Sequence, residues 1–193
     1  SGGGLWFIAS NPILTDVTIS GNTANYSGGM FIELSDPILT NVTISGNTAD
    51  DHGGGMRISN SNPILTNSII WDNSPESIYF FGDDPSTISI NYSDIEGGEE
   101  GINTNDDNIA YWLEGNIDAD PLFTDPDNGD LTLQEGSPCI DSGDPNLWFG
   151  DMDGTIGDMG VTGGMFVVPN FISHDFGEVG DNGSAKQFSL YNF

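Results

Sequence analysis

Residues 12–22 read PILTDVTISGN, residues 37–47 read PILTNVTISGN, and residues 63–73 read PILTNSIIWDN. The copies begin 25 and then 26 residues apart, and a glycine-rich stretch precedes each of them. A repeat of this length, with glycine turns and short runs rich in β-branched residues, is typical of a solenoid that stacks one coil on the next. The repeat therefore predicts the fold class before any other feature is considered.

Each repeat also shows the alternation of apolar and other residues that is typical of strands with one buried face. In the second repeat, Met30, Ile32 and Leu34 are predicted to point inward, and Val42 and Ile44 do so further along. Three short strands per coil, stacked coil on coil, make an all-β parallel β-helix.

The irregular remainder of the chain is predicted to bring the solenoid to about five coils. A fourth coil is expected between Ile78 and Ile95, and residues 99–116 are interpreted as an acidic excursion loop. Residues 131–133 and 139–140 are predicted to supply the last coil. The predicted organisation is regular repeats in 1–98, then the acidic loop, last coil and closing segment in 99–165, then a C-terminal β-strand appendage in 166–193.

Asparagines recur at one turn of the repeat, as Asn22, Asn47 and Asn73. Equivalent residues of stacked coils lie roughly 4.8 Å apart, so these side chains are predicted to form a ladder. Stacked amides can satisfy one another and the turn backbone. The alternative is a ligand site made of asparagines.

The charge of the chain limits its partners. Its 193 residues include 30 acidic residues and two basic ones, Arg57 and Lys186, for a net charge of −28. Such a chain repels nucleic acids, whereas it attracts calcium, other cations or a cationic partner.

No apolar run is long enough to span a membrane, which predicts no membrane insertion. The single cysteine, Cys139, allows no internal disulfide and is interpreted as a small buried core residue.

Several stretches carry a family resemblance. The glycine pair and strand followed by NVTISGNTA (41–49) resemble the repeat of right-handed parallel β-helix proteins of bacterial surfaces, the pectate-lyase-like solenoids. Residues 115–145 resemble the closing segment of large secreted β-helix proteins, and residues 171–193 resemble the first strands of an immunoglobulin-like module. The resemblance implies a right-handed coil and a secreted or cell-surface location. The chain opens within the repeat pattern, so we expect it to be a piece of a longer secreted protein.

The two ends of the chain suggest a mode of assembly. The strand at residues 5–8 has no preceding coil, and the two or three strands expected after residue 170 cannot bury their own face. Head-to-tail assembly by strand addition would solve both problems. The alternative is that the chain is a fragment whose neighbours lie in a longer sequence.

Aspartates around glycines suggest calcium binding. Asp125, Asp127 and Asp130 form one candidate loop, and Asp151, Asp153 and Asp158 form another. Alternating carboxylates let several oxygens converge on a hard cation. The competing interpretation is a set of turns in which aspartate side chains bond to their own backbone.

Two features of the sequence are candidates for catalysis. Arg57 is the only basic side chain in the solenoid, and its predicted column neighbours are aromatic, which favours a cation–π stack. Residues 50–52, Asp-Asp-His, are the nearest local cluster of acid–base groups, and a solvated loop is the competing interpretation.

Aromatic residues at outward positions offer a contact surface. Trp6, Phe31 and Trp71 are predicted to lie outside the solenoid, where they could stack on a surface glycan or bury against a protein partner. The alternative is that residues 74–85 cover these aromatic side chains.

Together these features predict a noncatalytic extracellular module for structure or adhesion, with a head-to-tail filament subunit and a polysaccharide lyase or hydrolase as alternatives.

Overall fold

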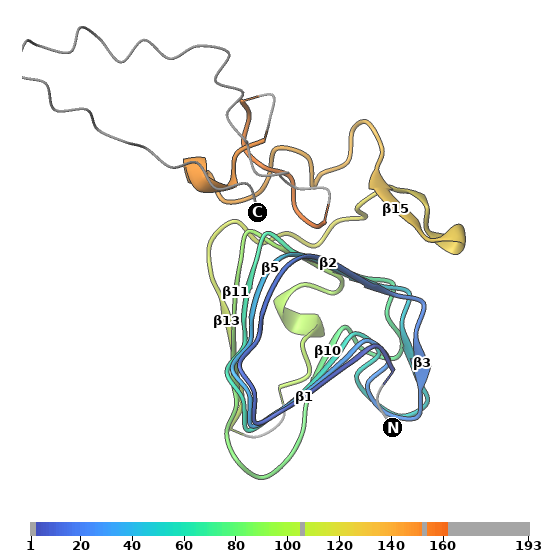
Figure 1. Cartoon of the computed structure of the whole chain (residues 1–193), viewed down its shortest axis with the longest axis vertical. Coiled ribbons are helices and arrows are strands. Elements are labelled where there is room, and N and C mark those ends of the chain that lie inside the picture. The colour runs from blue at the N-terminus through green and yellow to red at the C-terminus, as the bar shows by residue number, and fades with distance from the viewer. Residues whose placement is uncertain (1–2, 105–106, 152–153, 162–193) are drawn as a thin grey trace, which may run out of the picture.

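The computed structural model describes residues 3–104, 107–151 and 154–161. Over residues 3–117 the chain winds into a β-solenoid with about four full coils and a partial fifth (Figure 1). Every strand pair of the solenoid is parallel, and strands join the neighbouring coil in register, as in Leu5 with Met30 and Met30 with Met56. The predicted all-β parallel β-helix is therefore confirmed.

Three sheets run along the solenoid. The first contains β1 (Leu5–Ile8), β4 (Met30–Glu33), β7 (Met56–Ser59) and β10 (Ile78–Phe80). The second contains β2 (Ile13–Ser20), β5 (Ile38–Ser45), β8 (Ile64–Thr66), β9 (Ile69–Trp71), β11 (Thr87–Asn91), β12 (Asp94–Ile95) and β13 (Ile109–Trp112). The third pairs β3 (Thr23–Ala24) with β6 (Thr48–Ala49).

Corners between strands repeat as columns of left-handed backbone. Ala9, Leu34 and Asn60 occupy one such column, with φ angles of 49°, 51° and 45°. The predicted inward position of Leu34 is therefore wrong: β4 ends at Glu33, and the corner turns Leu34 outward, where it is 54% exposed. Asparagine tolerates this backbone region best among residues with a side chain, which fits Asn60, Asn41 and Asn67 at the corners.

The core of the solenoid is a stack of apolar side chains from facing sheets. Met30 and Ile32 of the first sheet pack against Leu39, Val42 and Ile44 of the second, and all five are fully buried. Each coil adds equivalent residues to the same columns, so burial of each coil depends on the coils above and below it.

The partial fifth coil differs from the sequence-based expectation. Residues 99–116 are not an excursion loop, because β13 pairs with β11 and Ile117 bridges to Asp94. A short 3₁₀ helix, η1 (Glu99–Gly101), and the buried Ile102 close the core at this end. In Figure 1, η1 lies across the cross-section of the solenoid.

The closing segment lies outside the solenoid. β14 (Phe123–Asp125), the 3₁₀ turn η2 (Pro126–Asn128) and β15 (Asp130–Leu133) form an antiparallel hairpin, so the predicted last coil is wrong. The segment continues through η3 (Leu147–Phe149) to residue 161. Its apolar residues form a second cluster on the outer side of β9, made of Ile69, Phe123, Leu131, Cys139 and Met159.

The predicted appendage at 166–193 lies outside the described residues. Among the residues that are described, no helix is long and apolar enough to cross a membrane.

Candidate functional site

An aromatic surface covers the outer side of the first sheet. Strand register stacks Trp6, Phe31, Arg57 and Tyr79 in one column. The Trp6 and Phe31 ring centroids are 4.3 Å apart, and Trp6 covers Phe31, which is only 7% exposed. The loops after β3 and β6 add Tyr26 and His52, and the residue after β10 adds Phe81. We call these residues the aromatic face: Trp6, Tyr26, Phe31, His52, Arg57, Tyr79 and Phe81.

Arg57 is the centre of this face. Its guanidinium carbon lies 4.0 Å from the centroid of the Phe81 ring and 4.8 Å from that of Tyr26. A cation between two rings is attracted to both, because the faces of aromatic rings carry negative potential. The column neighbours are aromatic as the sequence predicts, but the two rings that hold the guanidinium come from outside the column.

His52 is held in place by neighbours from the next coil. Its Nδ1 lies 2.9 Å from Glu76 Oε1, and its ring stacks on Tyr79 with centroids 4.2 Å apart. The second oxygen of Glu76 accepts the Gly53 N–H, and Asp51 lies 3.6 Å from His52 Nε2. These contacts give the Asp-Asp-His stretch a structural role, in which Glu76 fixes the loop and orients the ring.

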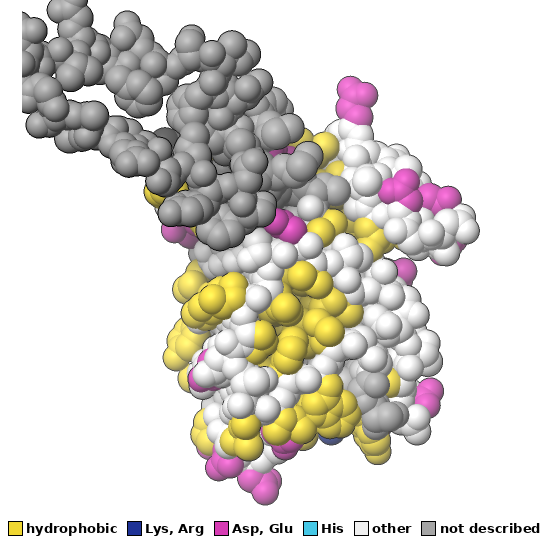
Figure 2. Space-filling view, in the orientation of Figure 1, with side chains coloured by type: hydrophobic (Ala, Val, Ile, Leu, Met, Phe, Trp, Pro, Cys, Tyr) yellow, Lys and Arg dark blue, Asp and Glu magenta, His cyan; other side chains and the backbone are white. Residues whose placement is uncertain are grey.

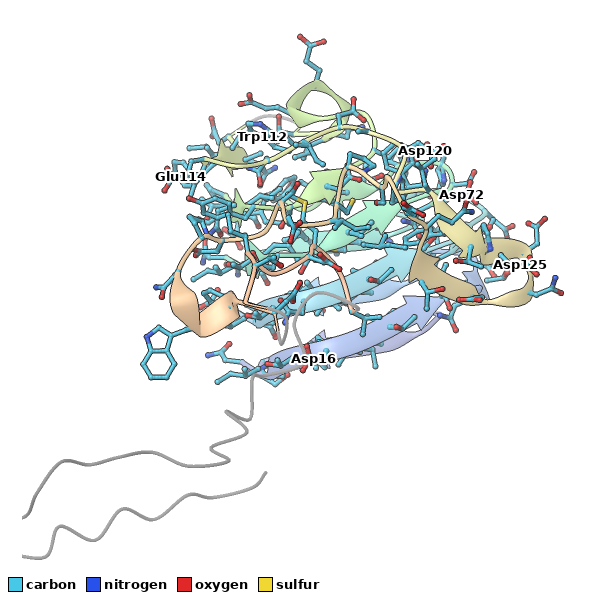
Figure 3. All side chains as sticks on the ribbon, turned by 90° about the horizontal axis from the view of Figure 1, so that it is seen from above. Asp16, Asp72, Trp112, Glu114, Asp120 and Asp125 are labelled. Carbon is cyan, nitrogen blue, oxygen red and sulfur yellow. The ribbon has the colours of Figure 1, made fainter. Side chains whose placement is uncertain are left out.

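Trp71 belongs to a different surface from Trp6 and Phe31. It lies on β9 of the second sheet, packs against the second apolar cluster, and lines a hollow of about 320 Å³ between the solenoid and the hairpin. Asp72 and Asp120 line the same hollow. Figure 3 shows Asp72, Asp120 and Asp125 on the same side of the molecule. The three predicted contact residues therefore form two surfaces, not one stripe.

The three asparagines of the repeat are brought together at one turn. Asn22 Nδ2 donates to Asn47 Oδ1, and Asn47 Nδ2 donates to Asn73 Oδ1, both over 2.9 Å. The same oxygens accept the backbone N–H groups of Asn22 and Asn47. Asn47 Nδ2 also reaches the carbonyl of Ile19. Their hydrogen-bonding groups are used inside the turn, which favours the structural interpretation over a ligand site.

The first candidate calcium loop forms the tip of the hairpin. Asp125 Oδ2 accepts a hydrogen bond from Asn128, and Asp130 Oδ1 accepts from the N–H and the hydroxyl of Thr132. The Thr132 bonds lower the pKa of Asp130. Asp127 is exposed on η2. These local bonds favour the turn interpretation at this loop.

The second candidate loop is joined by a residue that sequence reasoning missed. Ligand oxygens of Asp141, Asp151 and Asp158 lie within 4.8 Å of one another. Asp158 also accepts the backbone N–H of Asp141, which ties the two segments together. Three carboxylates at this spacing fit a hard divalent cation such as calcium. Asp153 lies outside the described residues.

Asp94 is buried where the closing segment covers β12. Its Oδ2 accepts from the Cys139 thiol over 3.1 Å, and its Oδ1 accepts the Ala119 N–H. Burial raises the pKa of Asp94 to about 6, although both hydrogen bonds oppose the rise. Burial also raises the pKa of the Cys139 thiol, with a further contribution from the Asp94 charge. Cys139 therefore acts as a neutral hydrogen-bond donor.

Comparison with known proteins identifies the fold family. The family model described as the right-handed β-helix region matches residues 1–117, which end where the solenoid ends. The chain belongs to the right-handed β-helix family. No curated protein and no solved structure matches the chain. Membership of the right-handed β-helix family establishes the coil and its hand, but not an activity, because function depends on the residues of each site.

Proposed function

We propose that this β-helix is a noncatalytic, secreted or cell-surface module that binds a neutral glycan through its aromatic face. The observation that carries the proposal is the tilted contact of the Trp6 ring with the Phe31 ring, beside Arg57 and the rings that hold its guanidinium. Trp6 is 50% exposed and Tyr26 is 42% exposed, so two rings of the face present large apolar surfaces to solvent. Such rings can stack on the apolar faces of sugars.

Rigidity and charge support this choice of ligand. Trp6 and Phe31 stand on hydrogen-bonded strands, and Phe31 packs against both Trp6 and Phe81, so little side-chain freedom of these two residues is lost on binding. The net charge of −28 repels acidic polysaccharides, and Arg57 is already engaged by Tyr26 and Phe81. A neutral glycan is not repelled by the negative charge of the chain, and it does not need a cationic side chain to bind.

Retardation on immobilised neutral polysaccharides, followed by titration calorimetry with their oligosaccharides, tests the proposal. Replacing Trp6 with alanine should weaken binding about tenfold or more, since a stacked aromatic ring is a typical hot spot. Trp148→Ala is the matched control, because Trp148 is 85% exposed on η3 and lies outside the aromatic face. Equal affinities for the W6A and W148A variants, or binding by neither the parent nor the variants, would refute the proposal.

A second candidate function is suggested by the hollow at the hairpin. There Trp71 lies beside Asp72 and Asp120, and polysaccharide-cleaving enzymes use pairs of carboxylates next to the sugar. Reducing-end assays on a panel of polysaccharides test this alternative. Release of sugar ends that is lost in both D72N and D120N would favour the enzyme over the noncatalytic module.

Head-to-tail assembly and calcium binding remain proposals. At the end of the described solenoid, η1 and Ile102 cover the core, which disfavours the addition of another chain's strand there. The Asp141, Asp151 and Asp158 cluster is the place where calcium would brace the closing segment.

A further inference from the structure

One wall of the second sheet carries no charge. It consists of residues 13–15, 38–40, 64–66, 87–91 and 109–112, one stretch from each coil, and we call it the neutral wall. None of these residues is acidic or basic, in a chain that has 30 acidic residues. In Figure 1 the neutral wall lies at the left of the solenoid, where β11 and β13 are labelled. The acidic chain thus presents one uncharged side.

An exposed column of isoleucines runs along the neutral wall. The register places Ile13 beside Ile38 and Ile38 beside Ile64, and the column ends with Ser89 and Tyr111. Ile38 and Ile64 are 41% and 43% exposed, although each has a coil on either side. Figure 2 shows hydrophobic side chains along the corresponding left edge of the solenoid. The exposure of the column is therefore a property of complete coils, and not of the ends of the solenoid.

The strands themselves do not require these isoleucines. Outward strand positions accept any β-branched residue, and the next outward column of the same wall has threonine at positions 15, 40 and 66. Threonine keeps the preference for strands and adds a hydroxyl group that bonds to water. Isoleucine in the same setting exposes apolar surface in three successive coils, and burial against a second apolar surface would remove that cost.

Acidic residues lie beside the neutral wall, but not on it. Asp36 Oδ1 accepts hydrogen bonds from the backbone N–H and the side-chain amide of Asn62, and Asp16 Oδ1 accepts one from Asn41. Both donors belong to the next coil, so these carboxylates are held along the margins of the wall. The surface between the margins is left to uncharged side chains.

We propose that the neutral wall is the contact surface between two copies of this chain, packed side by side as a two-fold dimer. A two-fold axis in the contact plane, along the strand of the second coil, places Ile38 against the partner's Ile38. It also places Ile13 against the partner's Ile64, because these residues stand one coil before and one coil after Ile38. The column is thereby matched to itself, as a contact between identical surfaces requires.

The size of the neutral wall suits a weak, reversible dimer. Its exposed apolar side chains amount to on the order of 500 Å² per copy, comparable to the largest apolar patch of a typical monomer. Two such surfaces bury on the order of 1,000 Å², which is near the lower limit for a specific contact between proteins. Sheets that pack face to face lie about 10 Å apart, which lets facing isoleucines touch.

Charge and chemistry favour a second copy over other partners. A cationic partner gains nothing from the neutral wall, because all 30 acidic residues lie elsewhere. Isoleucine offers a glycan neither an aromatic ring nor a hydrogen-bonding group. A second copy brings the same uncharged surface, so the contact itself contains no like charges. The remaining repulsion between two chains of net charge −28 acts over distances at which salt screens it.

Light scattering and sedimentation velocity over a range of protein concentrations test the dimer. We expect the mass to rise toward twice that of one chain, and association to tighten as salt is raised, because salt screens the repulsion between the chains. Ile38→Glu brings two carboxylates together at the two-fold axis and should weaken association about a hundredfold or more. The matched control is Ile156→Glu, since Ile156 is also 41% exposed but lies outside the neutral wall.

A milder variant keeps the test valid if the glutamate variant does not fold. Ile38→Thr with Ile64→Thr repeats the neighbouring threonine column, so the strands keep suitable residues, and it should weaken association about tenfold or more. Trp6→Ala should dimerise as the parent does, because Trp6 lies on the first sheet. The dimer therefore stands or falls independently of glycan binding by the aromatic face.

A monomer mass at every concentration and salt would overturn the proposal. A dimer that I38E weakens no more than I156E would place the contact elsewhere on the chain, and so would a dimer that the double threonine variant leaves as tight as the parent. Association that weakens as salt is raised would indicate a contact between charged groups, which the neutral wall does not contain.

Discussion

The thiol of Cys139 donates a hydrogen bond to the carboxyl group of Asp94 over 3.1 Å, although the two residues are 45 positions apart in the sequence. The pair joins the closing segment to the outer side of the fourth coil, and both side chains are fully buried. A carboxyl group in this position is stabilised in its protonated form, because burial penalises its charge.

The unfolding free energy should therefore depend on the protonation of Asp94. Its pKa is about 6 in the folded protein and 3.8 in the reference state, so the folded state binds the proton more tightly. The resulting stabilisation is complete below pH 3.8 and is lost as the pH rises through about 6. The shift corresponds to about 3 kcal/mol of unfolding free energy.

Urea denaturation at a series of pH values measures this dependence. The Asp94→Asn variant keeps a hydrogen-bonding side chain but cannot deprotonate. Its unfolding free energy should therefore fall less between pH 4 and 7 than that of the parent. Asp50→Asn removes one exposed carboxylate and serves as the control for general charge repulsion. Identical slopes for D94N and D50N would contradict the prediction.

Asn47 should be the most sensitive member of the asparagine ladder. Its amide bonds to Asn73 and to the carbonyl of Ile19, and it accepts from Asn22, all at a buried turn. Asn47→Ala leaves these partners unsatisfied and should lower the unfolding free energy by about 2–4 kcal/mol, measured by chemical denaturation. The exposed neighbour Asn25 provides the control, and N25A should change stability by no more than about 0.5 kcal/mol.

Replacing Arg57 with methionine should destabilise the aromatic face. The variant keeps an apolar stem and removes the charge between Phe81 and Tyr26, at an expected cost of about 1–2 kcal/mol in unfolding free energy. Salt should reduce the difference in unfolding free energy between the parent and the methionine variant, since it screens the attraction of the cation to the acidic chain. Arg57→Lys retains the charge, and its unfolding free energy should lie between those of the parent and the methionine variant. A methionine variant more stable than the parent would show that burial of the guanidinium outweighs its attraction to the rings.

Calcium should raise the thermal unfolding temperature if it occupies the cluster of Asp141, Asp151 and Asp158. At a concentration 100 times the dissociation constant, binding to the folded state alone adds about 2.7 kcal/mol. Scanning calorimetry in calcium and in chelator measures the shift. Asp158→Asn should abolish it, and Asp127→Asn, at the hairpin tip, should leave it intact. A shift that D127N removes and D158N retains would assign the ion to the hairpin.

The repeat made the regular coils predictable, because a fixed period places equivalent residues in the same column. The period fails at the fifth coil, where Thr87 pairs with Ile109 at a spacing of 22 residues. The sequence therefore predicts a loop where the structure has strand β13. The shortened spacing from Arg57 to Tyr79, also 22 residues, likewise concealed Tyr79 from the predicted aromatic column.

The sequence resemblance identifies residues 115–145 as a closing segment, but it does not predict where the segment lies on the solenoid. Leu131 and Leu133 alternate as any half-buried strand does, so their pattern fits a hairpin outside the solenoid as well as a coil within it. Contacts such as Asp144 N–H with Asn67 Oδ1 span 77 residues and follow no period. Asp141 was missed as a partner of Asp151 and Asp158 for the same reason.

The path of the closing segment across the second sheet has a consequence for folding cooperativity. In a solenoid each coil touches only its neighbours, so unfolding can start at an end and proceed coil by coil. Here the closing segment is hydrogen-bonded to Asp94 of the fourth coil, Asn67 of the third and Thr43 of the second. None of these coils can unfold without breaking its hydrogen bond to the closing segment. The closing segment therefore couples the second, third and fourth coils into one unit, which should unfold in a single transition.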